Sequence, residues 1–444
     1  MTETNPDIPV TPHDQPQQPD IPDQQSTTPA GKGVKRRSLL FAAGGAALGA
    51  AATWGWGALS PDILHRRPAA GENGAHSGVG NSPGAGAGPY GNEQVACHGA
   101  HQAGIITPPQ GFLVLTAYRL VAGIERIDVQ RLLKLWSEDI EFLTAGYATY
   151  TDTEPELSHL PASLTITVGF GPGLFDKLNI ADQRPTWLQQ LPPYSIDQLD
   201  EQWCGGDLVV QVCSDDPITT AHAARLLAKE AAAYATPQWT QHGSRNAPGV
   251  TLPGATMRNH FGQLDGTRNP KPQEEPNLIF RSGGPAWLNG GSTMVVRRIH
   301  MNLDSWDELD IPARDVVLGR RQSTGAPLTG EQEFDEPDLE AKNALGFPVI
   351  DTAAHIRRAR TDDGSQRIFR RPYNYVDNPR PGEISNVGLV FIAFQADLEH
   401  QYLPLQQQLA DLDLLNQWTT PVGSAVFAIP RGFQPGEYLG QDLI

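Results

Sequence analysis

Cysteine is scarce in this chain of 444 residues, and so are basic side chains. The three cysteines, Cys97, Cys204 and Cys213, do not have metal-ligand spacing and cannot all pair with one another. A disulfide scaffold and a cysteine-built zinc or iron–sulfur site are therefore excluded, and we expect free thiols. Lysine and arginine number 33 against 50 acidic residues, a formal net charge of −17. Because an acidic chain without a basic block repels phosphate backbones, no nucleic-acid partner is predicted.

Long apolar runs are also missing. The most apolar stretch near the N-terminus, residues 41–56, is roughly 16 residues of mostly Ala and Gly, too short and weak for a comfortable membrane span. The pair Arg36 and Arg37 precedes it, and this combination predicts a twin-arginine export signal read by the twin-arginine translocase. We expect a periplasmic, cell-envelope or extracellular protein. An uncleaved membrane anchor is the alternative, since no clear cleavage site follows Trp56.

Glycine and proline are abundant, with 45 and 38 residues. Much of this excess lies before residue 110, and residues 71–91 have the composition of a linker. Four segments are predicted: a disordered N-terminus with the export signal at 1–60, a linker at 61–92, and two folded units at 93–250 and 251–444.

The folded part alternates strand-like and helix-like patterns, and its two halves are similar. The first half has predicted strands at 111–120, 164–170 and 207–213 and a helix at 221–235; the second has strands at 293–301, 388–394 and 424–429 and a helix at 402–415. In each half a buried strand is followed by an acidic residue and a helix rich in alanine or leucine. This duplication predicts an α+β fold of two ferredoxin-like units packed sheet to sheet.

Three segments contain residues suited to chemistry. His355 follows two alanines, which leave room for a bulky group near an imidazole that could bind haem iron. Asp265 lies between glycines that let the main chain approach a flat ligand. Arg370 lies in an alternating, strand-like segment. Each feature taken alone fits a structural residue better than a functional one: a core histidine, an Asp-Gly turn and a solvated arginine.

Taken together, these segments resemble the dye-decolorizing peroxidases, specifically the branch exported by the twin-arginine route. The family's Gly-x-x-Asp-Gly signature matches Gly262 to Gly266, its proximal histidine matches His355, and its distal arginine matches Arg370, with Arg371 a weaker match. Further stretches that look like family blocks begin at His98, Val168, Gly205 and Gly423. The resemblance runs from about Glu93 to the C-terminus.

The resemblance implies a haem b protein of the dimeric α/β-barrel type, with haem in the C-terminal half. His355 would be the axial iron ligand, and the residues expected at the cofactor are Gly262, Gly266, Thr267 and Arg370. One departure is visible, because Pro372 stands where some relatives have an asparagine in the haem pocket. Asn374 could replace that asparagine if the strand bends.

The mechanism implied by the resemblance uses hydrogen peroxide and an organic electron donor. Asp265 would take a proton from one peroxide oxygen and return it to the other, while Arg370 would stabilise the negative charge. Because the intrinsic pKa of aspartate is ~3.9, we expect an acidic activity optimum. A carboxylate should hold the second nitrogen of His355, and Asp397 and Glu383 are the candidates. Candidates for a surface relay of electrons from large donors are Tyr373, Tyr375, Trp287 and Trp418.

Three functions compete at this point. The first is an exported haem peroxidase that reduces hydrogen peroxide and oxidises dyes or other organic donors. The second is a haem-binding protein of iron acquisition, which takes up haem or releases its iron beside iron-uptake partners. The third is a haem-free structural module. The presence of both Asp265 and Arg370 favours the enzyme, because a carrier requires only His355. The physiological donor and a possible homo-oligomer stay open.

Overall fold

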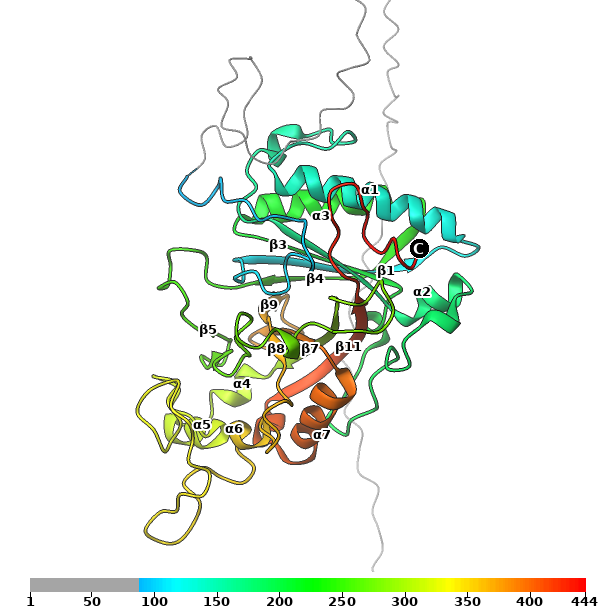
Figure 1. Ribbon diagram of the computed structural model, residues 1–444. Coiled ribbons are helices and arrows are strands. Elements are labelled where there is room, and N and C mark those ends of the chain that lie inside the picture. Colours follow the sequence, from blue (N-terminus) through cyan, green and yellow to red (C-terminus); the bar gives the residue numbers. More distant parts are fainter. Residues whose placement is uncertain (1–87) are drawn as a thin grey trace, which may run out of the picture. The chain divides into compact units, whose positions relative to one another are not determined.

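The computed structural model describes residues 88–444 (Figure 1). The predicted export signal and most of the predicted linker lie outside the described residues. Within residues 88–444, none of the helices combines the length and apolar character that a membrane crossing requires.

The N-terminal half contains four strands and three helices. They are β1 (Phe112–Leu120), α1 (Arg126–Thr144), β2 (Thr165–Phe170), α2 (Pro172–Lys177), β3 (Leu208–Ser214), α3 (Pro217–Ala231) and β4 (Ala235–Ser244). The three predicted strands are confirmed. The helix predicted at 221–235 begins four residues earlier, because Asp216 caps it by accepting a hydrogen bond from Thr219 N at 2.7 Å. It ends at Ala231, and the residues from Ala235 onward form a strand that was not predicted.

The C-terminal half repeats this order with more irregular connections. It contains β5 (Met257–Arg258), β6 (Leu264–Asp265), β7 (Ser292–Met301), α4 (Leu303–Trp306), α5 (Ile311–Leu318), α6 (His355–Arg358), β8 (Phe369–Arg370), β9 (Tyr373–Asp377), β10 (Asn386–Gln395), α7 (Leu403–Leu412) and β11 (Thr419–Ile429). The strands predicted at 293–301, 388–394 and 424–429 are confirmed. The helix predicted to reach residue 415 ends at Leu412, because Asp413 starts a separate turn by accepting a hydrogen bond from Leu415 N.

The strands form one closed, barrel-like sheet. In the N-terminal half the antiparallel order is β2-β3-β1-β4, and in the C-terminal half it is β11-β7-β10-β9. The two groups meet edge to edge through the pairs Ala428–Phe170 and Ser244–Asn374. The two units were predicted to pack sheet to sheet. Their strands instead belong to one sheet that continues around the barrel.

Helices cover the outside of this barrel, and side chains fill it. In Figure 1, α1 and α3 lie over the N-terminal strands, whereas α5, α6 and α7 lie on the C-terminal side. Trp136 on α1 is fully buried in the cluster beneath α1 and α3, and its indole N–H donates to Leu227 O at 3.0 Å. The space between the C-terminal strands and α6 and α7 is not filled by side chains, and it forms a cavity.

Candidate active site

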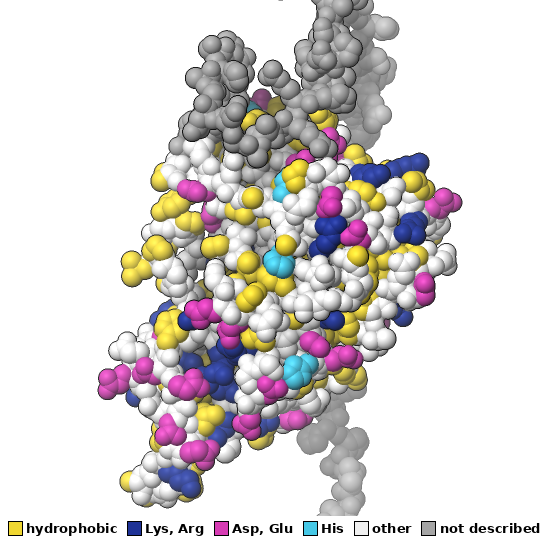
Figure 2. Space-filling model, viewed as in Figure 1, with side chains coloured by type: hydrophobic (Ala, Val, Ile, Leu, Met, Phe, Trp, Pro, Cys, Tyr) yellow, Lys and Arg dark blue, Asp and Glu magenta, His cyan; other side chains and the backbone are white. Residues whose placement is uncertain are grey.

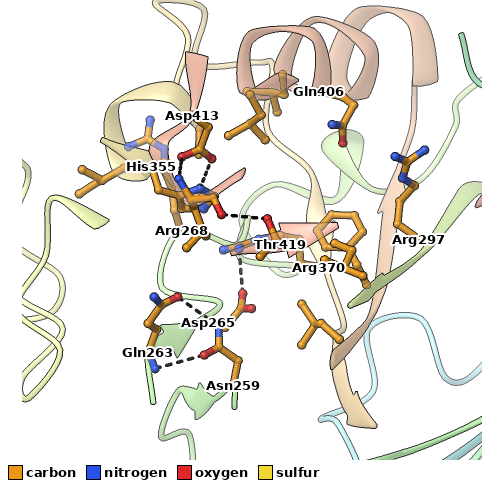
Figure 3. Close-up of a pocket in the computed structure, with 18 of the residues that line it drawn as sticks. Asn259, Gln263, Asp265, Arg268, Arg297, His355, Arg370, Gln406, Asp413 and Thr419 are labelled. Carbon is orange, nitrogen blue, oxygen red and sulfur yellow. Dashed lines mark hydrogen bonds and ion pairs between the residues drawn. The ribbon is translucent and has the colours of Figure 1, made fainter. Parts of the chain in front are cut away.

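A deep cavity lies between the C-terminal strands and helices α6 and α7 (Figure 3). Its empty space, including the opening to solvent, is about 1590 Å³, so it is large enough for a cofactor. The predicted site residues that line it are Asp265, Gly266, Thr267, His355 and Arg370. Residues separated by more than 100 positions in the sequence are therefore brought into one site.

His355 begins α6, and Asp413 holds one of its nitrogens. Its Nδ1 lies 2.5 Å from Oδ2 of Asp413, whose side chain is only 3% exposed. Burial alone lowers the pKa of His355, but the charge and the hydrogen bond of Asp413 outweigh burial and raise it. A carboxylate on Nδ1 orients the ring and leaves Nε2 as the nitrogen for a ligand.

The predicted partners of His355 were wrong. Asp397 caps the turn before α7 by accepting a hydrogen bond from His400 N, and Glu383 lies in the turn beside Arg380. Asp413 follows α7, and the end of this helix packs against α6. In the sequence, Asp413 is recognisable only as an aspartate at the end of a helix, which usually marks a cap. Its contact with His355 depends on how α6 and α7 pack.

Asp265 and Arg370 form an ion pair in the same cavity. Arg370 Nη1 donates to Asp265 Oδ1 at 2.9 Å, and the two side chains are 24% and 12% exposed. Asn269 positions this arginine, because its side chain donates to Arg370 O at 2.6 Å and accepts from Arg370 N at 3.2 Å. In Figure 3 the pair lies on the side of the cavity away from Asp413.

The two glycines of the signature have different structural roles. Gly266 lines the cavity at φ +134°, so the main chain approaches the empty space without a side chain. Gly262 lies in the preceding turn at φ +78°, outside the cavity lining, and a Cβ there would meet Gln322 Nε2 at 2.6 Å. Thr267 also lines the cavity, and its hydroxyl donates to Glu333.

The segment around Pro372 has no asparagine in the cavity. Pro372 separates β8 from β9, and the side chain of Asn374 donates to Arg258 O and does not line the cavity. Two residues that the sequence reasoning missed, Asn259 and Gln263, line the cavity near Asp265. They belong to the turn that carries the glycine signature, and this proximity in sequence was the available signal.

Arg371 is fully buried and does not face the cavity. Its guanidinium donates to Thr107 O and to Gln110 Oε1 of the N-terminal half. Consecutive arginines on this strand therefore point in opposite directions, and only Arg370 reaches the site.

Three of the four candidates for a surface relay are not on the surface. Tyr373, Tyr375 and Trp287 are at most 2% exposed and do not line the cavity, so their assignment as surface residues was wrong. Trp418 is partly buried, beside the cavity-lining Thr419, and its ring lies 5.3 Å from that of Trp306.

The donor set of the cavity fits a haem. In the described residues no group of three or more His, Cys, Asp or Glu side chains could hold a metal by themselves. A single histidine with its second nitrogen fixed suits an iron whose other ligands come from a porphyrin. A wide, largely apolar cavity with an acid–arginine pair defines a haem-dependent oxidoreductase site of the peroxidase class.

Comparisons with known proteins agree with this class. Two family models match the chain, described as "Dyp-type peroxidase, N-terminal" over residues 102–245 and "Dyp-type peroxidase, C-terminal" over residues 256–434. A dye-decolorizing peroxidase of Thermobifida fusca is 42% identical over 64% of this chain and 68% of that protein. A deferrochelatase of Escherichia coli K12 is 31% identical over 80% of this chain and 88% of that protein.

The solved structures agree as well. The crystal structure of a DyP-type peroxidase from Cellulomonas bogoriensis has a TM-score of 0.79 and 53% identity, covering 80% of this chain and 99% of that one. The chain belongs to the Dyp-type peroxidase family. It is a haem-dependent peroxidase that reduces hydrogen peroxide and oxidises dyes or other organic donors.

Proposed function

We propose that His355 holds the iron of haem b through Nε2, and that Asp265 and Arg370 react with hydrogen peroxide. The observation that carries this assignment is the arrangement of the cavity. The ring of His355 is fixed by Asp413 at 2.5 Å, while Asp265 and Arg370 form a pair at 2.9 Å beside the same empty space. A carrier of haem has no use for the second pair.

When bound, the haem supplies the redox-active iron that accepts two oxidising equivalents from hydrogen peroxide. Asp265 accepts the proton of one peroxide oxygen and returns it to the other oxygen, which leaves as water. Arg370 keeps the carboxylate oriented and stabilises the negative charge that develops as the O–O bond breaks. Asp413 keeps the imidazole of His355 in one tautomer and increases its donor strength.

Arginines that line the cavity support a site for the two haem carboxylates. Arg268, Arg320 and Arg367 line the cavity together with Arg370. Burial lowers the pKa of Arg320 to about 10, and nearby Arg360 adds to this shift. In a chain of net charge −17, such a cationic cluster favours carboxylate ligands. Figure 2 shows basic side chains gathered on the C-terminal half, with acidic side chains around them.

The repeated strand order supports a duplicated fold. Each half has the order of a ferredoxin-like unit, and we assign the units to residues 93–250 and 251–444, with haem in the second. Residues 1–60 and 61–92 would be the signal segment and the linker.

Export is the second part of the proposal. The pair Arg36 and Arg37 before a short apolar run supports transport by the twin-arginine translocase to the periplasm, cell envelope or outside. Fractionation of cells that produce the wild type and an Arg36→Lys, Arg37→Lys variant tests this assignment. Gel filtration of the same wild-type protein tests whether it is a homo-oligomer.

The alternative function is iron acquisition. The names of the relatives support it, since several proteins 31–33% identical to this chain are called deferrochelatases. In that case the protein would release iron from haem and work beside iron-uptake partners. Free porphyrin appearing from haem without peroxide would identify this activity.

An absorption spectrum followed by peroxide addition tests the main proposal. We expect a haem band that shifts with peroxide and returns when an organic donor is added. His355→Ala should abolish the band, and Arg370→Leu should slow its shift. A band that only bleaches under peroxide would favour the haem carrier instead.

A further inference from the structure

The hairpin that carries Asp265 is not part of the barrel. Its strands, β5 and β6, have two residues each and pair with each other, with Met257 opposite Asp265. A two-stranded hairpin is marginally stable at best by itself in water. Gly266 follows Asp265 at φ +134° and restricts the backbone less than any other residue would. The position of Asp265 therefore depends on contacts between this hairpin and the rest of the chain.

Asn269 provides one such contact, on the far side of Gly266 from the hairpin. Its side chain bonds to both backbone polar atoms of Arg370, so the chain four residues beyond Asp265 is fixed to β8. The hairpin can still rotate about the glycine that separates it from this contact. A fixed separation of Asp265 from Arg370 therefore requires a second contact nearer to the aspartate.

Glu333 makes this second contact. Its Oε1 accepts a hydrogen bond from Thr256 Oγ1 at 2.6 Å and another from Thr267 Oγ1 at 2.9 Å. Thr256 immediately precedes β5, and Thr267 follows Asp265 by two residues, so both hydroxyls lie at the end of the hairpin that carries Asp265. One carboxylate oxygen thus joins the two sides of the hairpin, and bonds to a charged acceptor are the strong kind. We call this contact the Glu333 clamp.

The loop that contains Glu333 is itself fixed against the hairpin. Arg320 Nη1 donates to Glu333 O at 2.8 Å and to Gly325 O at 2.6 Å. A Cβ at Gly325 would lie 3.2 Å from Glu333 Cγ and 2.4 Å from Leu264 Cδ1, so both side chains pack on this glycine. Glu333 is half-buried and does not line the cavity. Any effect on Asp265 is therefore transmitted by the hairpin and not by contact with a cofactor or peroxide.

We propose that Glu333 is a positioning residue for the reaction with hydrogen peroxide. By holding the hairpin, the Glu333 clamp sets the separation of Asp265 from Arg370; this inference rests on the roles proposed for that pair above. Asp265 Oδ1 lies 2.9 Å from Arg370 Nη1, and rotation of the hairpin would break this contact. A displacement of about 1 Å at a reacting group can slow a reaction about 10²-fold. The clamp keeps the carboxylate where it can exchange a proton with peroxide.

Two substitutions of Glu333 test the clamp in the haem-loaded enzyme. Glu333→Ala removes the acceptor, and the rate constant for the reaction with peroxide should fall about tenfold to 10²-fold in stopped-flow measurements. Glu333→Gln keeps an oxygen with two lone pairs for the two hydroxyls, so it should react nearly as fast as the wild type. Glu331→Ala, an exposed change in the same loop, is the matched control. If Glu333→Ala reacts within about twofold of that control, the proposal is overturned.

Hydrogen exchange of the holoenzyme shows where the structure loosens, without any turnover. In Glu333→Ala, mass spectrometry should detect faster deuterium uptake in residues 256–269, while uptake in the barrel strands stays that of the wild type. Glu333→Gln should show no such increase. A rise spread over the whole chain, or loss of the haem band from Glu333→Ala, would assign this residue to general stability or cofactor retention and contradict the proposal.

Thr256 allows the clamp to be broken from the other side, because its side chain does not line the cavity. Thr256→Val removes one of the two hydroxyls and should slow the reaction with peroxide about threefold to tenfold. In the double variant with Glu333→Ala the two effects should not add, since each change breaks the same contact. Additive effects would mean that Glu333 acts through another part of the molecule.

Asp265→Asn, measured beside these variants, separates failure of the clamp from failure of the proposed function. If Asp265→Asn reacts with peroxide as fast as the wild type, this carboxylate is not the proton shuttle and the proposed function fails. If Asp265→Asn is slow while Glu333→Ala behaves like Glu331→Ala, the function stands and the clamp alone is refuted.

Discussion

Asp413→Asn removes the charge of a buried carboxylate and keeps the shape of the side chain. Asp413 has two roles: Oδ2 lies 2.5 Å from His355 Nδ1, and Oδ1 accepts a hydrogen bond from Leu415 N at 2.9 Å. Asparagine is as good a cap as aspartate, so the turn after α7 should survive the change. The variant should therefore fold, and its effect should appear at His355.

The size of the effect follows from the burial of the pair. The Asp413 side chain is 3% exposed, so solvent does not weaken its interaction with His355. A hydrogen bond to a charged partner contributes about 1.5–3 kcal/mol, which corresponds to a factor of about 10 to 100 in an equilibrium constant. Loss of a carboxylate behind a metal-binding histidine has effects of the same size in other proteins. We expect haem affinity to fall by this factor.

The assay is transfer of haem from the variant to an excess of apomyoglobin, together with the midpoint potential of the iron. The transfer rate should rise, and the potential should rise because a weaker imidazole donor stabilises the ferric state less. Asp411→Asn, an exposed change on the same helix, is the matched control. If Asp413→Asn releases haem within twofold of that control, the assignment of Asp413 as the partner of His355 is wrong.

Three further predictions concern reactivity and stability. Asp265→Asn should slow the reaction with peroxide about 10²-fold to 10⁴-fold in stopped-flow measurements and abolish the acidic optimum of turnover, whereas an unchanged rate would exclude this carboxylate as the proton shuttle. Burial, assisted by a neighbouring glutamate, raises the pKa of Asp139 to about 9. The folded state therefore keeps a proton that the unfolded chain releases above about pH 4, and stability falls by up to about 1.4 kcal/mol per pH unit as pH rises toward 9. Asp139→Asn should flatten this dependence in urea unfolding at pH 5 and pH 8; parallel curves for the two proteins would contradict it. Gly388→Ala should destabilise the fold by about 1–3 kcal/mol, because its Cβ would lie 2.1 Å from a backbone oxygen of β7, while Gly364→Ala, which meets nothing within 4 Å, should not.

The strands were predictable because their signal is local. Residues 207–213 and 388–394 are mostly apolar and mostly buried, and the strands begin and end close to those runs. Ala235–Ser244 was missed because only some of its positions are buried and it contains Thr, Gln, His and Ser, so its pairing with β1, and not its composition, makes it a strand. The helix before it was misplaced because Asp216 and Pro217 start it earlier than the alanine-rich run suggested.

The functional site likewise has one part that the sequence shows and another part that depends on the tertiary structure. The sequence by itself singled out Asp265, His355 and Arg370, since Asp265 lies in a glycine turn and both His355 and Arg370 stand in segments that resemble family motifs. The tertiary structure alone decided their partners. Asp413 reaches His355 across 58 residues, and Asp197 reaches Arg297 across 100, from one half of the chain to the other. Local patterns report how a segment folds, whereas contacts between distant side chains depend on how strands and helices pack in the closed barrel.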